Sequence, residues 1–182
     1  MSPTPIRLTS ADVERYARLR LRMLLDSPWA FGASPEDDKG LDLAHLATTL
    51  AGETHAVFAI EAPSAPDQAP RERELIASTR VLRRTSPTFR HRATIWGVFV
   101  EPGRRGRGYG RAVTEAAVSH ARTWPVVDYV DLRVNAAAPV APRLYESPGF
   151  EAWEREPEAT EVGGLRYDEI HMPLRLRVRG DE

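Results

Sequence analysis

The chain has no cysteine among its 182 residues. Composition alone therefore excludes disulfides, thiolate metal ligands and a cysteine nucleophile. Lysine is scarce too, because 24 of the 25 Lys and Arg residues are arginines and the single lysine is Lys39. The arginines are spread along the chain, and we interpret this bias as codon usage rather than as a basic surface.

Long hydrophobic runs are also missing. No apolar stretch approaches the ~20 residues that a membrane span needs. The first residues lack the basic and then apolar pattern of a signal peptide, so we expect a cytoplasmic protein with no membrane partner. A formal net charge of −1 argues against a general polyanion binder, and we expect no nucleic-acid partner. The length favours one domain over residues 1–182.

Hydrophobic periodicity and turn residues predict eleven elements in the order β-α-α-β-β-β-α-β-α-β-β. One strand-helix-strand crossover lies within a largely antiparallel run. The predicted fold class is α/β (α+β), with a mixed, mostly antiparallel sheet of six to seven strands and helices on both faces. The predicted strands cover 6–9, 55–61, 75–84, 93–102, 126–135, 150–156 and 165–176, and the later helices cover 41–51, 108–122 and 141–149. Residues 62–74, with three prolines, are predicted to form a hairpin loop.

The first helix has the clearest start signal. Thr9 or Ser10 can cap it, and Asp12 stands three residues after Thr9, in the position of a capping box. Apolar residues then follow helical spacing as far as Leu24, and only Arg20 interrupts the stripe.

A glycine- and arginine-rich loop joins the strand TIWGVFV to the next helix. It reads EPGRRGRGYGRAV over residues 101–113. Unpaired amides and the helix dipole favour an anion at such a helix start, glycine allows close backbone approach, and arginine adds charged donors. Three interpretations of the loop are open: a phosphate site, a nucleic-acid contact and a solvated surface turn. Walker A needs a lysine that is absent, and the dinucleotide fingerprint fails because residue 111 is arginine.

The loop does match the pattern R/Q-x-x-G-x-G/A, from Arg105 to Gly110. Further segments along the chain carry the same similarity: VFV-x-P before the loop, then LRVN, RLYESPGFE and YDEIHMPLRL, and near the N-terminus LRLRMLLDSPWAFGAS. On these motifs, nearly the whole chain resembles the GCN5-related N-acetyltransferase (GNAT) family. The resemblance implies transfer of an acetyl group from acetyl-CoA, as co-substrate, to a primary amine of unknown identity.

The resemblance also implies a coenzyme site. Backbone groups of Val98 and Val100 would pair with the pantetheine arm, which requires strands 93–102 and 126–135 to separate, with a bulge near Gly97. The N–H of Val100 or Phe99 would polarise the thioester carbonyl. Amides of 105–110 would bind the pyrophosphate beside Arg105 and Arg107, while a solvated role stays open for Arg104 and Arg111. The expected cofactor-binding residues are Val98, Phe99, Val100, Arg105, Gly106, Arg107, Gly108, Tyr109, Gly110, Arg111 and Asn135.

Tyr145 is the expected catalytic residue, by its place in RLYESPGF. A phenol of pKa about 10 can protonate a departing thiolate of pKa about 8.5; packing of its ring alone is the alternative. Without cysteine, direct attack by the amine in a ternary complex is the simplest mechanism. The family's usual asparagine is replaced by Ala138, and Asn135 either takes over its contact or caps the strand.

No general base is assigned. Glu101, His91, Glu169, His171 and a water chain all remain open, and no metal is expected. On the acceptor side, the aromatic pair of Trp29 and Phe31 either lines the pocket or fills the helix junction, and the acidic segment 34–38 either attracts a cationic amine or is a solvated turn. Rival functions are a coenzyme-binding sensor without turnover and a nucleic-acid contact through Arg104 and Arg105. We also expect a homodimer.

Overall fold

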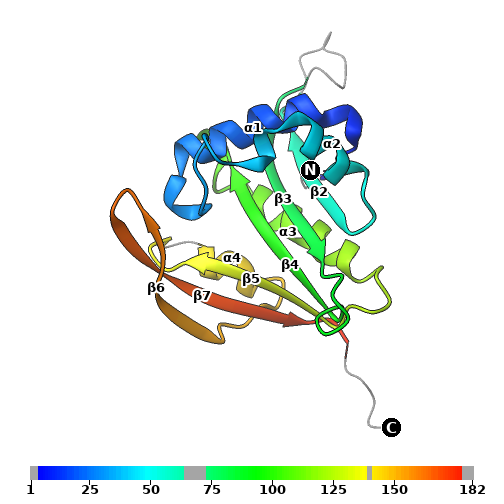
Figure 1. The fold of residues 1–182 in the computed structure, drawn as a ribbon, viewed down its shortest axis with the longest axis vertical. Coiled ribbons are helices and arrows are strands. Elements are labelled where there is room, and N and C mark those ends of the chain that lie inside the picture. The colour runs from blue at the N-terminus through cyan, green and yellow to red at the C-terminus, as the bar shows by residue number, and fades with distance from the viewer. Residues whose placement is uncertain (1–3, 64–72, 139–140, 178–182) are drawn as a thin grey trace.

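The computed structural model describes residues 4–63, 73–138 and 141–177. Its elements follow one another in the predicted order (Figure 1). The N-terminal half contains β1 (Ile6–Arg7), α1 (Val13–Asp26), α2 (Leu43–Ala51), β2 (His55–Glu61), β3 (Leu75–Arg83) and β4 (Arg92–Val100). The C-terminal half contains α3 (Tyr109–Ala121), β5 (Tyr129–Asn135), α4 (Ala141–Glu146), β6 (Glu154–Val162) and β7 (Leu165–Arg175).

All these strands join one seven-stranded sheet, in the order β1-β2-β3-β4-β5-β7-β6. Only β4 and β5 pair in parallel, and every other pair is antiparallel. The predicted mixed, mostly antiparallel sheet is therefore confirmed.

Helices cover both faces of this sheet. Leu19 of α1 and Leu46 of α2 share a buried cluster with Val57 of β2. Ala117 of α3 and Tyr145 of α4 belong to a second cluster on the opposite face, behind the sheet in Figure 1. No helix among the described residues is long and apolar enough to cross a membrane.

Two predicted strand boundaries were wrong. The strand predicted from residue 126 begins at Tyr129, because Val127 N–H still donates to Trp124 O in the turn after α3. The strand predicted at 150–156 instead covers Glu154–Val162. Phe150 is 1% exposed and its N–H donates to Tyr145 O, so the apolar start of that segment closes α4 and fills the core.

A glycine pair sets the end of β6. Gly163 and Gly164 have φ angles of 59° and 76°, the left-handed conformation that two-residue hairpins require. The earlier hairpin loop, 62–74, lies mostly outside the described residues, although Ala62 N–H donates to Glu74 O where β2 and β3 pair.

The start of α1 carries a buried charge network. The predicted capping box is confirmed: Thr9 N–H donates to Asp12 Oδ2, and the Thr9 hydroxyl accepts from Ala11 N–H. Arg15, only 7% exposed, bonds Asp12 at 2.9 Å and Glu61 at 2.6 Å, and its Nε donates to Arg73 O. This guanidinium therefore ties α1 to β2 and to the start of β3.

We predict that Arg15→Ala lowers the free energy of unfolding by about 3–5 kcal/mol, because it leaves two largely buried carboxylates without their cation. Arg18→Ala is the matched control one turn on: its pair with Glu14 is exposed and 3.8 Å long, and should contribute at most about 1 kcal/mol. Urea denaturation of both variants measures the difference. Equal losses would show that the network contributes no more than a surface pair.

Candidate active site

The sheet opens between β4 and β5. The two strands pair only from Arg92 to Thr94, opposite Tyr129 to Asp131. Beyond these residues they separate towards their C-terminal ends, as Figure 1 shows. The remaining residues of β4, through Val98 and Val100, have no strand partner on this side.

A bulge in β4 accompanies the opening. Three residues of β3, Ser78 to Arg80, lie opposite four residues of β4, Trp96 to Phe99. The β4 strand therefore holds one extra residue at this point. Gly97, inside this bulge, has a φ of 63°, a left-handed conformation that side chains rarely adopt. The predicted bulge and the predicted strand separation are both present, and they leave room for an extended ligand beside β4.

The glycine loop lies at the C-terminal end of β4. Gly106 and Gly108 both have left-handed φ angles, 75° and 79°, and Gly108 caps α3 without a side chain. From Gly106 to Arg111, no backbone N–H donates to another described residue, because the first intrahelical donor is the N–H of Ala112. The N–H of Arg105 was predicted to bind the pyrophosphate, but it donates to Pro102 O instead. Six successive amides are thus available for an anion.

Gly110, by contrast, is a packing glycine. A Cβ there would lie 3.2 Å from the Leu144 side chain of α4 and 3.5 Å from Val100. Its missing side chain lets α3 approach α4 and the end of β4 closely.

The arginines of the loop divide into paired and unpaired groups. Arg105 bonds Val100 O at 3.0 Å and Asp26 at 2.5 Å, and Arg111 pairs with Glu115 at 2.7 Å. The side chains of Arg104 and Arg107 have no bond to other described residues. Arg105 and Arg107 were both predicted to contact the phosphate. Of the two, only Arg107 has a guanidinium that no described residue binds.

Tyr145 is buried on α4. Its side chain is 7% exposed, and its ring centroid lies 6.2 Å from that of Phe150. Burial raises the pKa of the Tyr145 hydroxyl, so the phenol stays protonated at neutral pH. The ring packing predicted as the alternative is present. The raised pKa keeps the hydroxyl protonated, and it also makes the phenol a weaker acid toward a thiolate.

Asn135 joins the C-terminal end of β5 to the segment after α1. Its amide Nδ2 donates to Trp29 O at 2.9 Å, and its Oδ1 accepts from Ala137 N–H at 2.9 Å. Asn135 therefore caps the strand, as one of the two readings expected. Its coenzyme contact stays a prediction.

The general-base candidates have partners of their own. Glu101 pairs with Arg22 at 2.5 Å, so its carboxylate already has a cationic partner. His91 packs its ring against Tyr129 and accepts two backbone N–H bonds at its carbonyl.

Glu169 and His171 form a cluster with Glu156 whose ligand atoms lie within 4.8 Å of one another. Three such groups match the donor set of a metal site. However, His171 bonds Glu156 at 2.8 Å, and Arg133 lies 3.4 Å from Glu156 and 3.5 Å from Glu169. The Arg133 guanidinium already supplies the positive charge that these carboxylates need. We therefore interpret the cluster as an ion-pair network.

The acidic segment 34–38 contains both exposed and buried carboxylates: Glu36 and Asp37 are exposed, whereas the side chain of Asp38 is buried. Asp37 accepts from Ser34 N–H at 2.8 Å, and that bond, with a second from the Ser34 hydroxyl, lowers the pKa of Asp37. The Asp38 side chain is 6% exposed and is bonded by the Arg20 guanidinium.

Phe31 fills the helix junction, as one of its two readings expected. It packs against Phe99 at 6.2 Å, and the Arg20 guanidinium lies 5.3 Å from its ring centroid.

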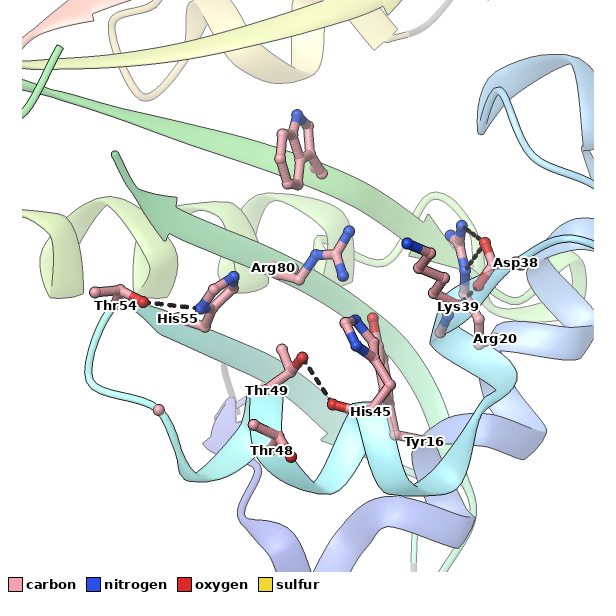
Figure 2. A pocket seen from close by; sticks show the side chains of 13 residues that line it. Tyr16, Arg20, Asp38, Lys39, His45, Thr48, Thr49, Thr54, His55 and Arg80 are labelled. Carbon is pink, nitrogen blue, oxygen red and sulfur yellow. Dashed lines mark hydrogen bonds and ion pairs between the residues drawn. The ribbon is translucent and has the colours of Figure 1, made fainter. Parts of the chain in front are cut away.

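A cavity of about 550 Å³ lies next to the Arg20–Asp38 pair, between α2 and the sheet. Figure 2 shows His55 and Arg80 on its sheet side and His45 on its helix side. Sequence reasoning missed this cavity and the ion pairs that Arg20 and Arg22 form. The one signal for Arg20 was its position in the apolar stripe of α1.

Comparison with known proteins identifies the family of this chain. A model of the Acetyltransferase (GNAT) family matches residues 23–150. Mycothiol acetyltransferase from Thermobispora bispora is 46% identical over 59 residues, which are 32% of this chain and 20% of that protein. The chain thus matches about a fifth of the length of that relative.

Solved structures with the same fold cover almost the whole chain. The structure of yncA from Salmonella typhimurium with its cofactor acetyl-CoA has a TM-score of 0.79 at 20% identity, covering 100% of this chain and 98% of that one. Arabidopsis thaliana NAA60 in complex with acetyl-CoA has a TM-score of 0.72 at 19% identity, covering 96% and 99%. Ribosomal-protein-alanine N-acetyltransferase from Brucella melitensis has a TM-score of 0.74 at 18% identity, covering 94% and 99%.

These structures share the fold of this chain, and the family match spans well over half of its length. The chain belongs to the Acetyltransferase (GNAT) family.

Proposed function

We propose that the protein is an acetyl-CoA-dependent N-acetyltransferase that passes the acetyl group directly to a primary amine in a ternary complex. One observation carries the proposal: the gap between β4 and β5 ends at a loop with six unpaired amides. An extended arm that ends in a pyrophosphate has the shape and the charge to fill both parts.

The backbone of this chain would do most of the binding. Val98 and Val100 would bond the arm as a neighbouring strand does, and Gly106 to Arg111 would bond the pyrophosphate, with Arg107 adding charge. The N–H of Val100 or Phe99 would polarise the carbonyl of the thioester, the group that acetyl-CoA supplies. A preorganised donor of this kind lowers a barrier by about 3 kcal/mol.

The proton balance assigns a role to Tyr145. The amine nitrogen bonds to the acetyl carbon as the carbon–sulfur bond breaks, and the leaving sulfur takes the phenolic proton. The new amide nitrogen then releases its extra proton, which returns through water in the cleft to the Tyr145 oxygen. The attacking amine must lose a proton first, because a group of pKa about 10.4 is only about 0.04% neutral at pH 7. With Glu101 and His91 engaged elsewhere, we assign this step to water in the cleft.

Other features remain predictions: a single domain over residues 1–182, a cytoplasmic location and a homodimer. Light scattering of the purified protein tests the homodimer, and a mass of 20.3 kDa would show a monomer instead.

We predict that Gly106→Ala weakens acetyl-CoA binding at least about tenfold, because alanine disfavours the left-handed conformation that aims the loop amides at one anion. Gly164→Ala is a matched control, since its φ of 76° equals that of Gly106 within a degree and neither glycine has a neighbour within 4 Å. Isothermal titration calorimetry measures both. Both variants should lose similar stability, and equal affinities would remove the loop from the coenzyme site.

We predict that Tyr145→Phe lowers kcat about 100-fold or more and changes the KM for acetyl-CoA little, since it removes the proton donor and keeps the buried ring. Tyr129→Phe, at the other end of β5 from Asn135, should keep the wild-type kcat. Coenzyme A release, followed with a thiol reagent, measures turnover without background from a chain that lacks cysteine. Wild-type turnover by Tyr145→Phe would assign the residue to packing alone, and coenzyme binding without any turnover would favour a sensor.

A further inference from the structure

The cavity beneath α2 is lined by one side chain from each of three neighbouring strands. His55 lies on β2, Arg80 on β3 and Trp96 on β4. Arg80 stands directly opposite Trp96 across the β3–β4 pair, and it stands opposite Val57, two residues after His55, across the β2–β3 pair. Side chains two residues apart share a face of a sheet, so all three project from the face that α1 and α2 cover.

The charge on this lining is predominantly positive. Among the described residues that line the cavity, Asp38 is the only carboxylate, and Arg20 already neutralises it. Arg80 and Lys39 remain, and neither side chain has an ion pair or hydrogen bond to another described residue. The only lysine of the chain therefore faces the same cavity as an unpaired arginine.

Arg80 is held in place without using its hydrogen-bond donors. Its guanidinium lies 5.1 Å from the Trp96 ring centroid, a cation–π contact that orients the group and leaves its five N–H donors unused. His55 adds a neutral polar group: burial, and then the charges of Arg80 and His45, lower the pKa of its ring. A fixed planar donor beside a flexible ammonium suits an oxyanion.

The cavity lies beside the bulge of β4. Trp96 directly precedes Gly97 in the β4 bulge, and Arg20 Nη1 lies 3.8 Å from the position that a Cβ of residue 97 would take. A ligand held at Arg80 and Lys39 can therefore extend towards the point where β4 leaves β5.

We propose that this cavity binds the oxyanion, carboxylate or phosphate, of an acceptor that carries its amine at the other end. The identity of this ligand as the acceptor rests on the proposed acetyltransferase function, whereas the anion site itself does not. The acceptor class is thus an anionic amine, rather than the cationic amine that the acidic segment suggested.

Two matched pairs of amines test the acceptor class. β-Alanine is compared with β-alaninamide for a carboxylate, and phosphoethanolamine with ethanolamine for a phosphate. We expect kcat/KM to be at least about tenfold higher for the anionic member of one pair, and that pair identifies the oxyanion. Equal kcat/KM values within both pairs would overturn the proposal.

Arg80→Met and Lys39→Met should each reduce the preference for the anionic member. Neither side chain has a polar partner among the residues that the structure describes, so their removal leaves none of these groups unpaired, and thermal melting checks the fold. Arg84→Met is the matched control: Arg84 also lies over an aromatic ring, 5.6 Å from that of Phe89, but outside the cavity. A preference that survives both cavity variants would also overturn the proposal.

A binding measurement separates this inference from the proposed function. Inorganic phosphate is titrated calorimetrically into protein saturated with coenzyme A, so that the glycine loop is occupied; if coenzyme A does not bind, the same titration uses the free protein. We expect Arg80→Met to bind phosphate at least about fivefold more weakly than wild type and Arg84→Met. Equal binding to all three, or none to wild type, refutes the anion site whether or not any amine is acetylated.

Discussion

The unpaired backbone between β4 and β5 is the constraint on which the rest of the site depends. Parallel strands ordinarily pair along their shared length, but here pairing stops after Thr94 and Asp131. Backbone N–H and C=O groups seek partners when they are taken out of water. The bulge at Gly97 keeps β4 turned away, so those partners must come from a ligand or from water. A sheet that cannot close is thus the basis of the binding function.

The C-terminal half of α1 connects the glycine loop to the cavity beneath α2. Arg22 pairs with Glu101 at the end of β4, and Asp26 pairs with Arg105 in the glycine loop. Two residues before Arg22, Arg20 bonds Asp38 at the edge of the cavity beneath α2. The same helix therefore fixes the proposed coenzyme loop and the proposed acceptor cavity relative to each other. Partly buried pairs of this kind are less screened by salt than exposed ones.

Sequence reasoning succeeded where the signal was local. The capping box at Thr9 and the β2 strand were found because each depends on a few consecutive residues, and the bulge near Gly97 was found through the family resemblance. It failed at 150–156, where an apolar start resembled a strand although Phe150 fills the core beside α4. It also assigned the amide of Arg105 to the anion site, and that amide is used in a turn.

The sequence by itself determined the order of the elements, the mixed sheet, the glycine loop and the family resemblance, since periodicity, caps and turns act over short distances along the chain. Only the tertiary structure decided which charges are paired. Arg22 and Glu101, like Asp26 and Arg105, are 79 residues apart, and no local pattern links them. The same holds for the cavity: Lys39, Arg80 and Trp96 come together only because α2 packs over the sheet. Long-range packing neutralised the carboxylate of Asp38 and left Arg80 unpaired, and so it decided the charge that a ligand meets.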